Sequence, residues 1–62
     1  MNELDFRAVL QEALLLYMEE EPPFAIRDVR TFREAGVLTT NEGLVVRTQD
    51  GSEFQLTIVK SR

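Results

Sequence analysis

The sequence contains no cysteine, no histidine and no tryptophan. Without cysteine the chain has no disulfide bond to hold it together, and nothing in it points to an oxidising compartment. The joint absence of cysteine and histidine also removes the usual zinc ligands. Histidine is the side chain whose ordinary pKa lies nearest to neutral pH, so its absence leaves the chain without the usual general base.

Glycine is scarce as well, and the three glycines, Gly36, Gly43 and Gly51, stand far apart in the chain. Isolated glycines do not form the glycine-rich loop that cradles a phosphate group. The serines, Ser52 and Ser61, have no histidine in the chain that could activate a hydroxyl as a nucleophile. We therefore predict that the chain is not an enzyme and has no catalytic, cofactor-binding or metal-binding residues.

Long hydrophobic runs are also missing. The longest uninterrupted apolar run, Ala13–Met18, is far shorter than the roughly 20 residues of a membrane-spanning helix. It also lacks the basic flank of a signal peptide. The 62 residues are 44% hydrophobic and 29% charged, a composition typical of one small folded domain. We therefore predict a single cytoplasmic domain over residues 1–62 that does not bind a membrane.

The first part of the chain predicts a helix over about residues 3–20. Asn2 is a favourable N-cap, and Asp5 follows three residues later, which is close to a capping box. The residues that follow are mostly good helix formers. Pro22 and Pro23 end the helix, because the residue before a proline avoids helical backbone angles.

The apolar side chains of this helix fall into two sets when they are placed at 100° per residue. The broader set predicts the face that packs on the core. The smaller set points away from it, so it must pack elsewhere, meet a partner or stay exposed. The predicted core set is Phe6, Val9, Leu10, Ala13, Leu14, Leu16 and Tyr17, and the opposite set is Leu4, Ala8 and Leu15.

Two alternating segments, Leu44–Gln49 and Glu53–Lys60, predict a β-hairpin at the end of the chain. A two-residue turn at Asp50-Gly51 would set apolar residues opposite polar ones along the whole hairpin. A three-residue loop, 49–51, makes one face continuously apolar and requires a positive φ at Gly51. We therefore predict the longer loop. Its expected cross-strand pairs are Leu44–Leu56, Val46–Phe54, Val45–Gln55 and Arg47–Glu53.

The middle of the chain has two interpretations. The residue types over Ile26–Phe32 favour a strand that continues irregularly through Val37 and Leu38. The alternative is a second helix capped by Gly36 and followed by a short strand. In either case residues 39–43 predict a turn, with Gly43 at its special position. Both interpretations give three antiparallel strands.

The predicted fold is α+β, with the N-terminal helix packed on one face of a three-stranded antiparallel β-meander. The expected core face of the sheet carries large apolar side chains, among them Leu44, Val46 and Phe54. The other face mixes polar and apolar residues, as a solvated face does. We expect that solvated face to consist of Val45, Arg47, Gln49, Glu53, Gln55, Thr57 and Val59.

A short chain without disulfides gains stability by association, which favours a small interaction or adaptor domain that forms a homodimer. We expect a second copy of the chain as its partner, with another protein next in order. The last strand is an edge strand with little charge to block pairing. The candidate interface residues are Leu4, Ala8, Leu15, Leu56, Ile58 and Val59.

The alternative function is nucleic-acid binding through a modest basic set. Acidic residues interleave with these arginines, and the net charge of the chain is −4. Phosphate neutralisation needs a basic surface, so we rank this function second. The residues of this candidate surface are Arg27, Arg30, Arg33 and Arg47.

Overall fold

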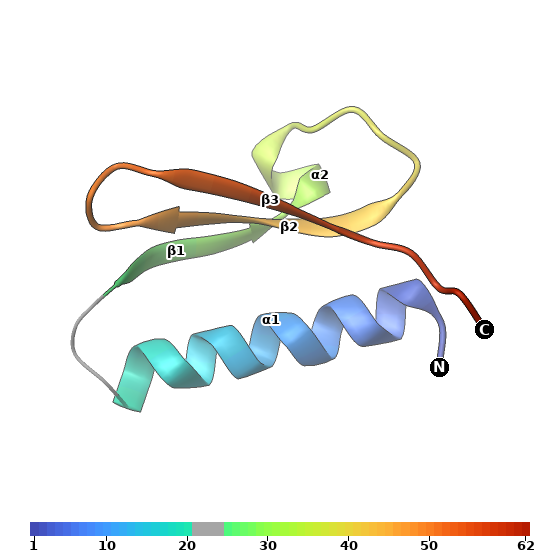
Figure 1. The fold of residues 1–62 in the computed structure, drawn as a ribbon, viewed down its shortest axis with the longest axis horizontal. Helices are drawn as coiled ribbons and strands as arrows, with labels where there is room; N and C mark the ends of the chain where they lie inside the picture. Colours follow the sequence, from blue (N-terminus) through green and yellow to red (C-terminus); the bar gives the residue numbers. More distant parts are fainter. Residues whose placement is uncertain (21–24) are drawn as a thin grey trace.

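A computed structural model describes residues 1–20 and 25–62, so the predicted Pro22-Pro23 boundary lies outside the described residues. The three strands form one antiparallel sheet in the order β1-β2-β3. The long helix α1 runs along one face of this sheet, and the short helix α2 lies over the other face (Figure 1). This arrangement confirms the predicted α+β meander. The elements are α1 (Glu3–Glu20), β1 (Ile26–Thr31), α2 (Phe32–Ala35), β2 (Glu42–Thr48) and β3 (Glu53–Ile58).

The N-terminus of α1 has the predicted capping box. The Asp5 N–H donates to the Asn2 side-chain oxygen at 2.8 Å, and the Asn2 N–H donates to the Asp5 carboxylate at 3.4 Å. These two bonds satisfy donors that the first turn of a helix leaves without a partner inside the helix. The helix therefore begins where the sequence predicted.

The face of α1 that packs on the sheet is narrower than predicted. Leu10, Leu14 and Met18 pack against the core, which consists of Val29, Leu44 and Val46 on the sheet. The remaining large residues of the predicted core set stay about half exposed: Phe6 48%, Val9 51%, Leu16 52% and Tyr17 47%. The prediction of one broad core face was wrong, because a three-stranded sheet contacts a helix along only one stripe.

The β2–β3 hairpin has the predicted register. Val46 pairs with Phe54, Arg47 pairs with Glu53, and Gly51 has the positive φ of 92° that the three-residue loop requires. The alternation of apolar residues specified this register, because a shift by one residue would turn the apolar face outward. The strand β3 ends at Ile58 rather than at Lys60.

Asp50 stabilises the loop of this hairpin through its carboxylate. The Thr48 hydroxyl donates to Asp50 Oδ1, and the Ser52 N–H donates to the same atom at 3.0 Å. The hydrogen bond from Thr48 is the main reason that the pKa of the Asp50 carboxyl lies below its ordinary value, and the bond from Ser52 adds to this effect. The exposed loop is thus held by one side chain as well as by the backbone conformation of Gly51.

The middle of the chain combines parts of both predicted alternatives. The strand β1 ends at Thr31, and the next residues form the short helix α2. Thr31 and Glu34 form a capping box at its start, and Gly36, with φ 78°, ends it in the left-handed conformation. No strand forms over 37–39. The predicted strand was therefore right up to Thr31 and wrong beyond it.

The second face of the sheet is not fully solvated, which corrects the prediction. Val45 is only 2% exposed, because α2 folds back over this face and places the buried Phe32 there. Gly43 lies inside β2 rather than in a turn, and its φ is not positive. A Cβ at Gly43 would collide with the Phe32 ring, so the missing side chain provides the space for that ring.

We predict that Gly43→Ala lowers the free energy of unfolding more than Gly51→Ala does. The new Cβ at Gly43 meets both the Phe32 ring and the carbonyl oxygen of Leu56, and overpacking of this kind costs about 1–3 kcal/mol. At Gly51 an added Cβ meets open space, so the only cost of alanine is the backbone strain of the positive φ, about 1 kcal/mol. Chemical denaturation measures both losses. Equal losses would contradict the packing of Phe32 on Gly43.

A second prediction concerns Asp50 and pH. Because folding lowers the pKa of its carboxyl, its contribution should be present above the ordinary pKa of 3.8 and be lost as the pH falls through the lower folded value. The isosteric Asp50→Asn serves as the comparison. The free energy of unfolding should differ between the two proteins at neutral pH, and the difference should shrink below pH 3.8. A difference independent of pH would show that the charge has no role.

Candidate functional site

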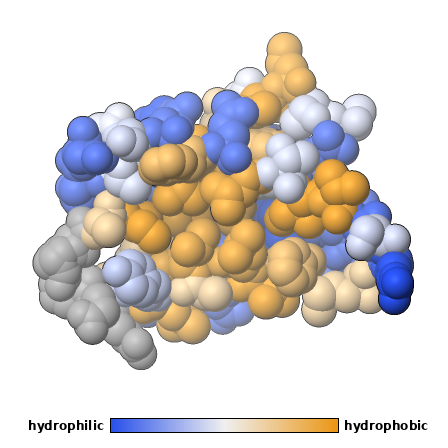
Figure 2. Space-filling view, in the orientation of Figure 1, coloured by the Kyte–Doolittle hydropathy of each residue, from blue (hydrophilic) through white to orange (hydrophobic). Residues whose placement is uncertain are grey.

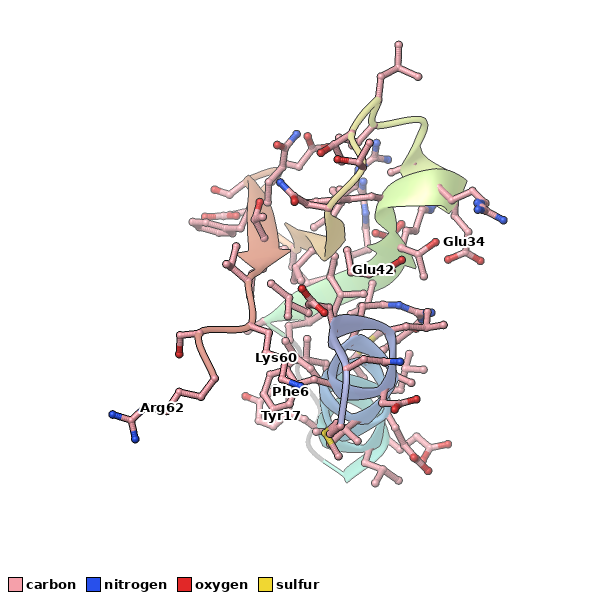
Figure 3. All side chains as sticks on the ribbon, turned by 90° about the vertical axis from the view of Figure 1, so that its right-hand side faces the viewer. Phe6, Tyr17, Glu34, Glu42, Lys60 and Arg62 are labelled. Carbon is pink, nitrogen blue, oxygen red and sulfur yellow. The ribbon has the colours of Figure 1, made fainter. Side chains whose placement is uncertain are left out.

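The most distinctive surface is apolar and extends across the open side of the molecule, where α1 meets β3. Figure 2 shows hydrophobic side chains gathered over this side, in the orientation of Figure 1. Figure 3 shows Phe6 and Tyr17 on the side of α1 that faces the segment carrying Lys60. We call this region the α1–β3 surface. Its residues are Phe6 and Tyr17 on α1 together with Phe54, Leu56 and Ile58 on β3.

The position of α1 explains why this surface is exposed. The helix packs more closely on β1 and β2 than on β3. Phe54 points to the same face of the sheet as Val46, its buried partner, yet Phe54 is 56% exposed. The apolar face of the sheet is therefore wider than the helix that covers it, and its uncovered part lies on β3.

A groove of about 510 Å³ runs through this surface between the start of α1 and the end of β3. Phe6 and Leu10 line it from the helix, and Leu56 and Ile58 line it from the strand. Lys60 also lines it, beyond the end of the strand. A groove with mostly apolar walls suits an apolar side chain rather than a charged ligand.

β3 is an edge strand, and among residues 1–20 and 25–62 no strand pairs with its outer edge. The Thr48 N–H donates to the Ser52 carbonyl, so alternate residues of β3 from Ser52 onward direct their backbone groups toward β2. The residues between them direct their N–H and C=O groups outward. Within the described residues these are Glu53, Gln55 and Thr57, and the β2–β3 register is uninterrupted along them.

The structure divides the predicted interface residues between two sides of the molecule. Leu56 and Ile58 belong to the α1–β3 surface, and Val59 lines its groove. The helical set, Leu4, Ala8 and Leu15, is exposed but lies on the flank of α1 away from the Phe6 flank, as its helical spacing requires.

Sequence reasoning missed Phe6, Tyr17 and Phe54 as surface residues, because each belongs to a pattern that predicts core packing. For the two residues of α1 one signal was available. The apolar residues of α1 span an arc around the helix that is wider than the stripe one flat sheet can contact, so part of that arc had to remain exposed.

Two of the arginines proposed for nucleic-acid binding are held by carboxylates. Arg47 lies 3.0 Å from Glu53, and Arg30 lies 3.6 Å from Asp28. The other two arginines are exposed: Arg27 lies on β1 and Arg33 lies on α2. The structure therefore does not gather a group of unneutralised positive charges from this set, which comprises Arg27, Arg30, Arg33 and Arg47.

Comparison with known proteins gives no match: no family model, no curated protein and no solved structure is similar to the chain. Within residues 1–20 and 25–62, no helix is both long and apolar enough to cross a bilayer. In the same residues no three acidic side chains come together as metal ligands would. The α1–β3 surface is therefore the feature of the molecule from which a function can be inferred.

We predict that the Arg47–Glu53 pair contributes little to stability. Both side chains are more than one-third exposed, so water and salt screen their attraction. A double-mutant cycle with Arg47→Ala and Glu53→Ala should give a coupling of about 0.3–1 kcal/mol, smaller at high salt. A coupling above this range, or one insensitive to salt, would contradict the exposed geometry.

Proposed function

We propose that this chain is a small protein-interaction domain that self-associates through its α1–β3 surface and has no catalytic activity of its own. The observation that carries the proposal is the contiguous apolar exposure of α1 and β3 around one groove. Monomeric proteins rarely leave apolar patches of this kind uncovered unless the patch meets a partner.

The accessible surface area of the chain supports this proposal. A folded monomer of 7.1 kDa is expected to expose roughly 4,100 Å². The observed area is 4678 Å², an excess of roughly 600 Å². A standard interface covers about 800 Å² on each partner, so one interface would remove an area comparable to this excess.

The buried core is also small. A chain of this size has little margin over conformational entropy, and a dimer adds burial without lengthening the chain. A two-fold dimer makes every new contact twice, which is why it is the commonest small assembly. In the described residues the buried apolar side chains are Val29, Phe32, Leu44, Val45 and Val46.

A second copy suits the α1–β3 surface better than an unrelated partner does. The surface offers two things at once, a regular strand edge and apolar side chains beside it. A second copy presents the same two features, so a two-fold axis can match edge with edge and apolar side chains with apolar side chains. The charged residues that line its groove, Glu3, Lys60 and Arg62, include both signs of charge, whereas most of the exposed groove wall is apolar and matches the apolar side chains of a second copy.

We predict that the mass in solution is twice 7.1 kDa at micromolar concentration and falls on dilution. Tyr17→Glu should shift the chain to monomer, because it places a charge in the interface at a helix position where glutamate is well tolerated. Leu38→Glu is the matched control. Leu38 is 99% exposed on the loop before β2, and its replacement adds the same charge outside the surface.

Sedimentation equilibrium over a dilution series, with circular dichroism to check folding, makes the measurement. A cooperatively folded monomer that persists at high micromolar concentration would overturn the proposal. Equal dissociation by Leu38→Glu and Tyr17→Glu would show that net charge, and not this surface, governs association. Should Tyr17→Glu fail to fold, Phe54→Ser tests the same surface from the strand.

A further inference from the structure

We infer that two copies join by antiparallel pairing of their β3 strands, with Leu56 on the two-fold axis, to form one six-stranded sheet. This arrangement rests on the proposed self-association and specifies its geometry. Three features of the molecule define this dimer: the open edge of the sheet, the register that keeps apolar residues together, and the position of the two helices.

The two edges of the sheet differ, and β3 is the one suited to pairing. The β1 edge carries a bulge between Ile26 and Asp28, and charged side chains alternate along it at Asp28 and Arg30. Bulges and charges are the features that prevent strand addition at an edge. The β3 edge has an unbroken register, contains no proline, and ends before the cation Lys60.

The apolar side chains of β3 select one register. A symmetric antiparallel pair places one residue opposite its own copy, and opposed residues share a face of the sheet. With Gln55 on the axis, Ile58 would oppose Ser52. With Thr57 on the axis, Phe54 would oppose Lys60.

Only Leu56 on the axis sets every apolar residue of this face against another. Phe54 then opposes Ile58 of the second copy, and Leu56 opposes itself. The same register sets Gln55 opposite Thr57 on the other face, so no like charges meet there. This is the same criterion that specified the β2–β3 hairpin, and there the structure agrees with it.

The axis of such a pair is perpendicular to the sheet, so both copies of α1 lie on the same face. Each helix is centred over β1 and β2, which separates the two helices by about four strand spacings, or about 19 Å. Helices in direct contact lie only about 8–10 Å apart. The space between them is filled by the aromatic side chains that the monomer leaves exposed, Phe6, Tyr17 and Phe54.

The groove has a defined occupant in this arrangement. Because Phe54 of the second copy lies opposite Ile58, its ring is placed beside the groove that Phe6, Leu56 and Ile58 line. Each copy thus supplies one aromatic side chain to the groove of the other. This reciprocal filling accounts for a half-exposed Phe54 and a mostly apolar groove on the same face.

Introduced cysteines test the register directly, because the chain has none of its own. Gln55 and Thr57 are exposed on the face of the sheet away from α1, so substitution there leaves the core intact. In the proposed register these two residues are opposed across the interface at about 5.5 Å between Cα atoms, a separation that suits a disulfide. The double variant Gln55→Cys/Thr57→Cys should form a covalent dimer under mild oxidation, with most of the protein at dimer mass on a non-reducing gel.

The single variants are the matched controls, and neither should cross-link. A covalent dimer from Gln55→Cys alone, or from Thr57→Cys alone, would place that residue on the axis and overturn the Leu56 register. A dimer by sedimentation that none of the three variants traps would overturn β3 pairing while leaving self-association standing. A monomer by sedimentation would overturn the proposed function itself.

Discussion

The structure depends on the packing of one helix stripe on a sheet that is wider than the stripe. Leu10 and Leu14 pack against the cluster of Val29, Leu44 and Val46, in which Leu44 is 0% exposed. A helix is about 10 Å across with its side chains, whereas three strands span about 14 Å. Because α1 is centred over β1 and β2, the part of the sheet that the helix does not cover lies on β3, where Phe54 stays exposed.

The short helix α2 lies on the opposite face of the sheet and packs on β1 and β2, so β3 is the least covered strand on this face as well. The Phe32 ring lies against the backbone of Gly43, and Val45 is buried on the same face, so β2 is buried on both faces at this end of the sheet. The strand β1 joins α2 directly at Thr31 and carries a bulge, which leaves β3 as the regular, open edge. The uncovered apolar side chains and the regular open edge therefore lie on the same side of the molecule, which is the basis for proposing a second copy there.

Part of the candidate surface followed from the sequence. The spacing of apolar residues indicated Leu56 and Ile58 as an apolar edge, and it showed that α1 carries more apolar residues than one face needs. It did not show which of them would stay outside, because apolar side chains nearly surround the helix. Phe6 and Tyr17 belong to the same arc as Leu10, and only the lateral position of α1 on the sheet separates them.

The sequence by itself determined the features that depend on neighbouring residues. The Asn2 cap, the Gly51 conformation and the hairpin register each follow from local hydrogen bonding, from φ, or from a period of two along a strand. The tertiary structure alone decided where α1 lies across the sheet and where Phe32 packs. Both depend on contacts between segments far apart in the chain, and on the space left by a missing Cβ at Gly43, which no local pattern reveals.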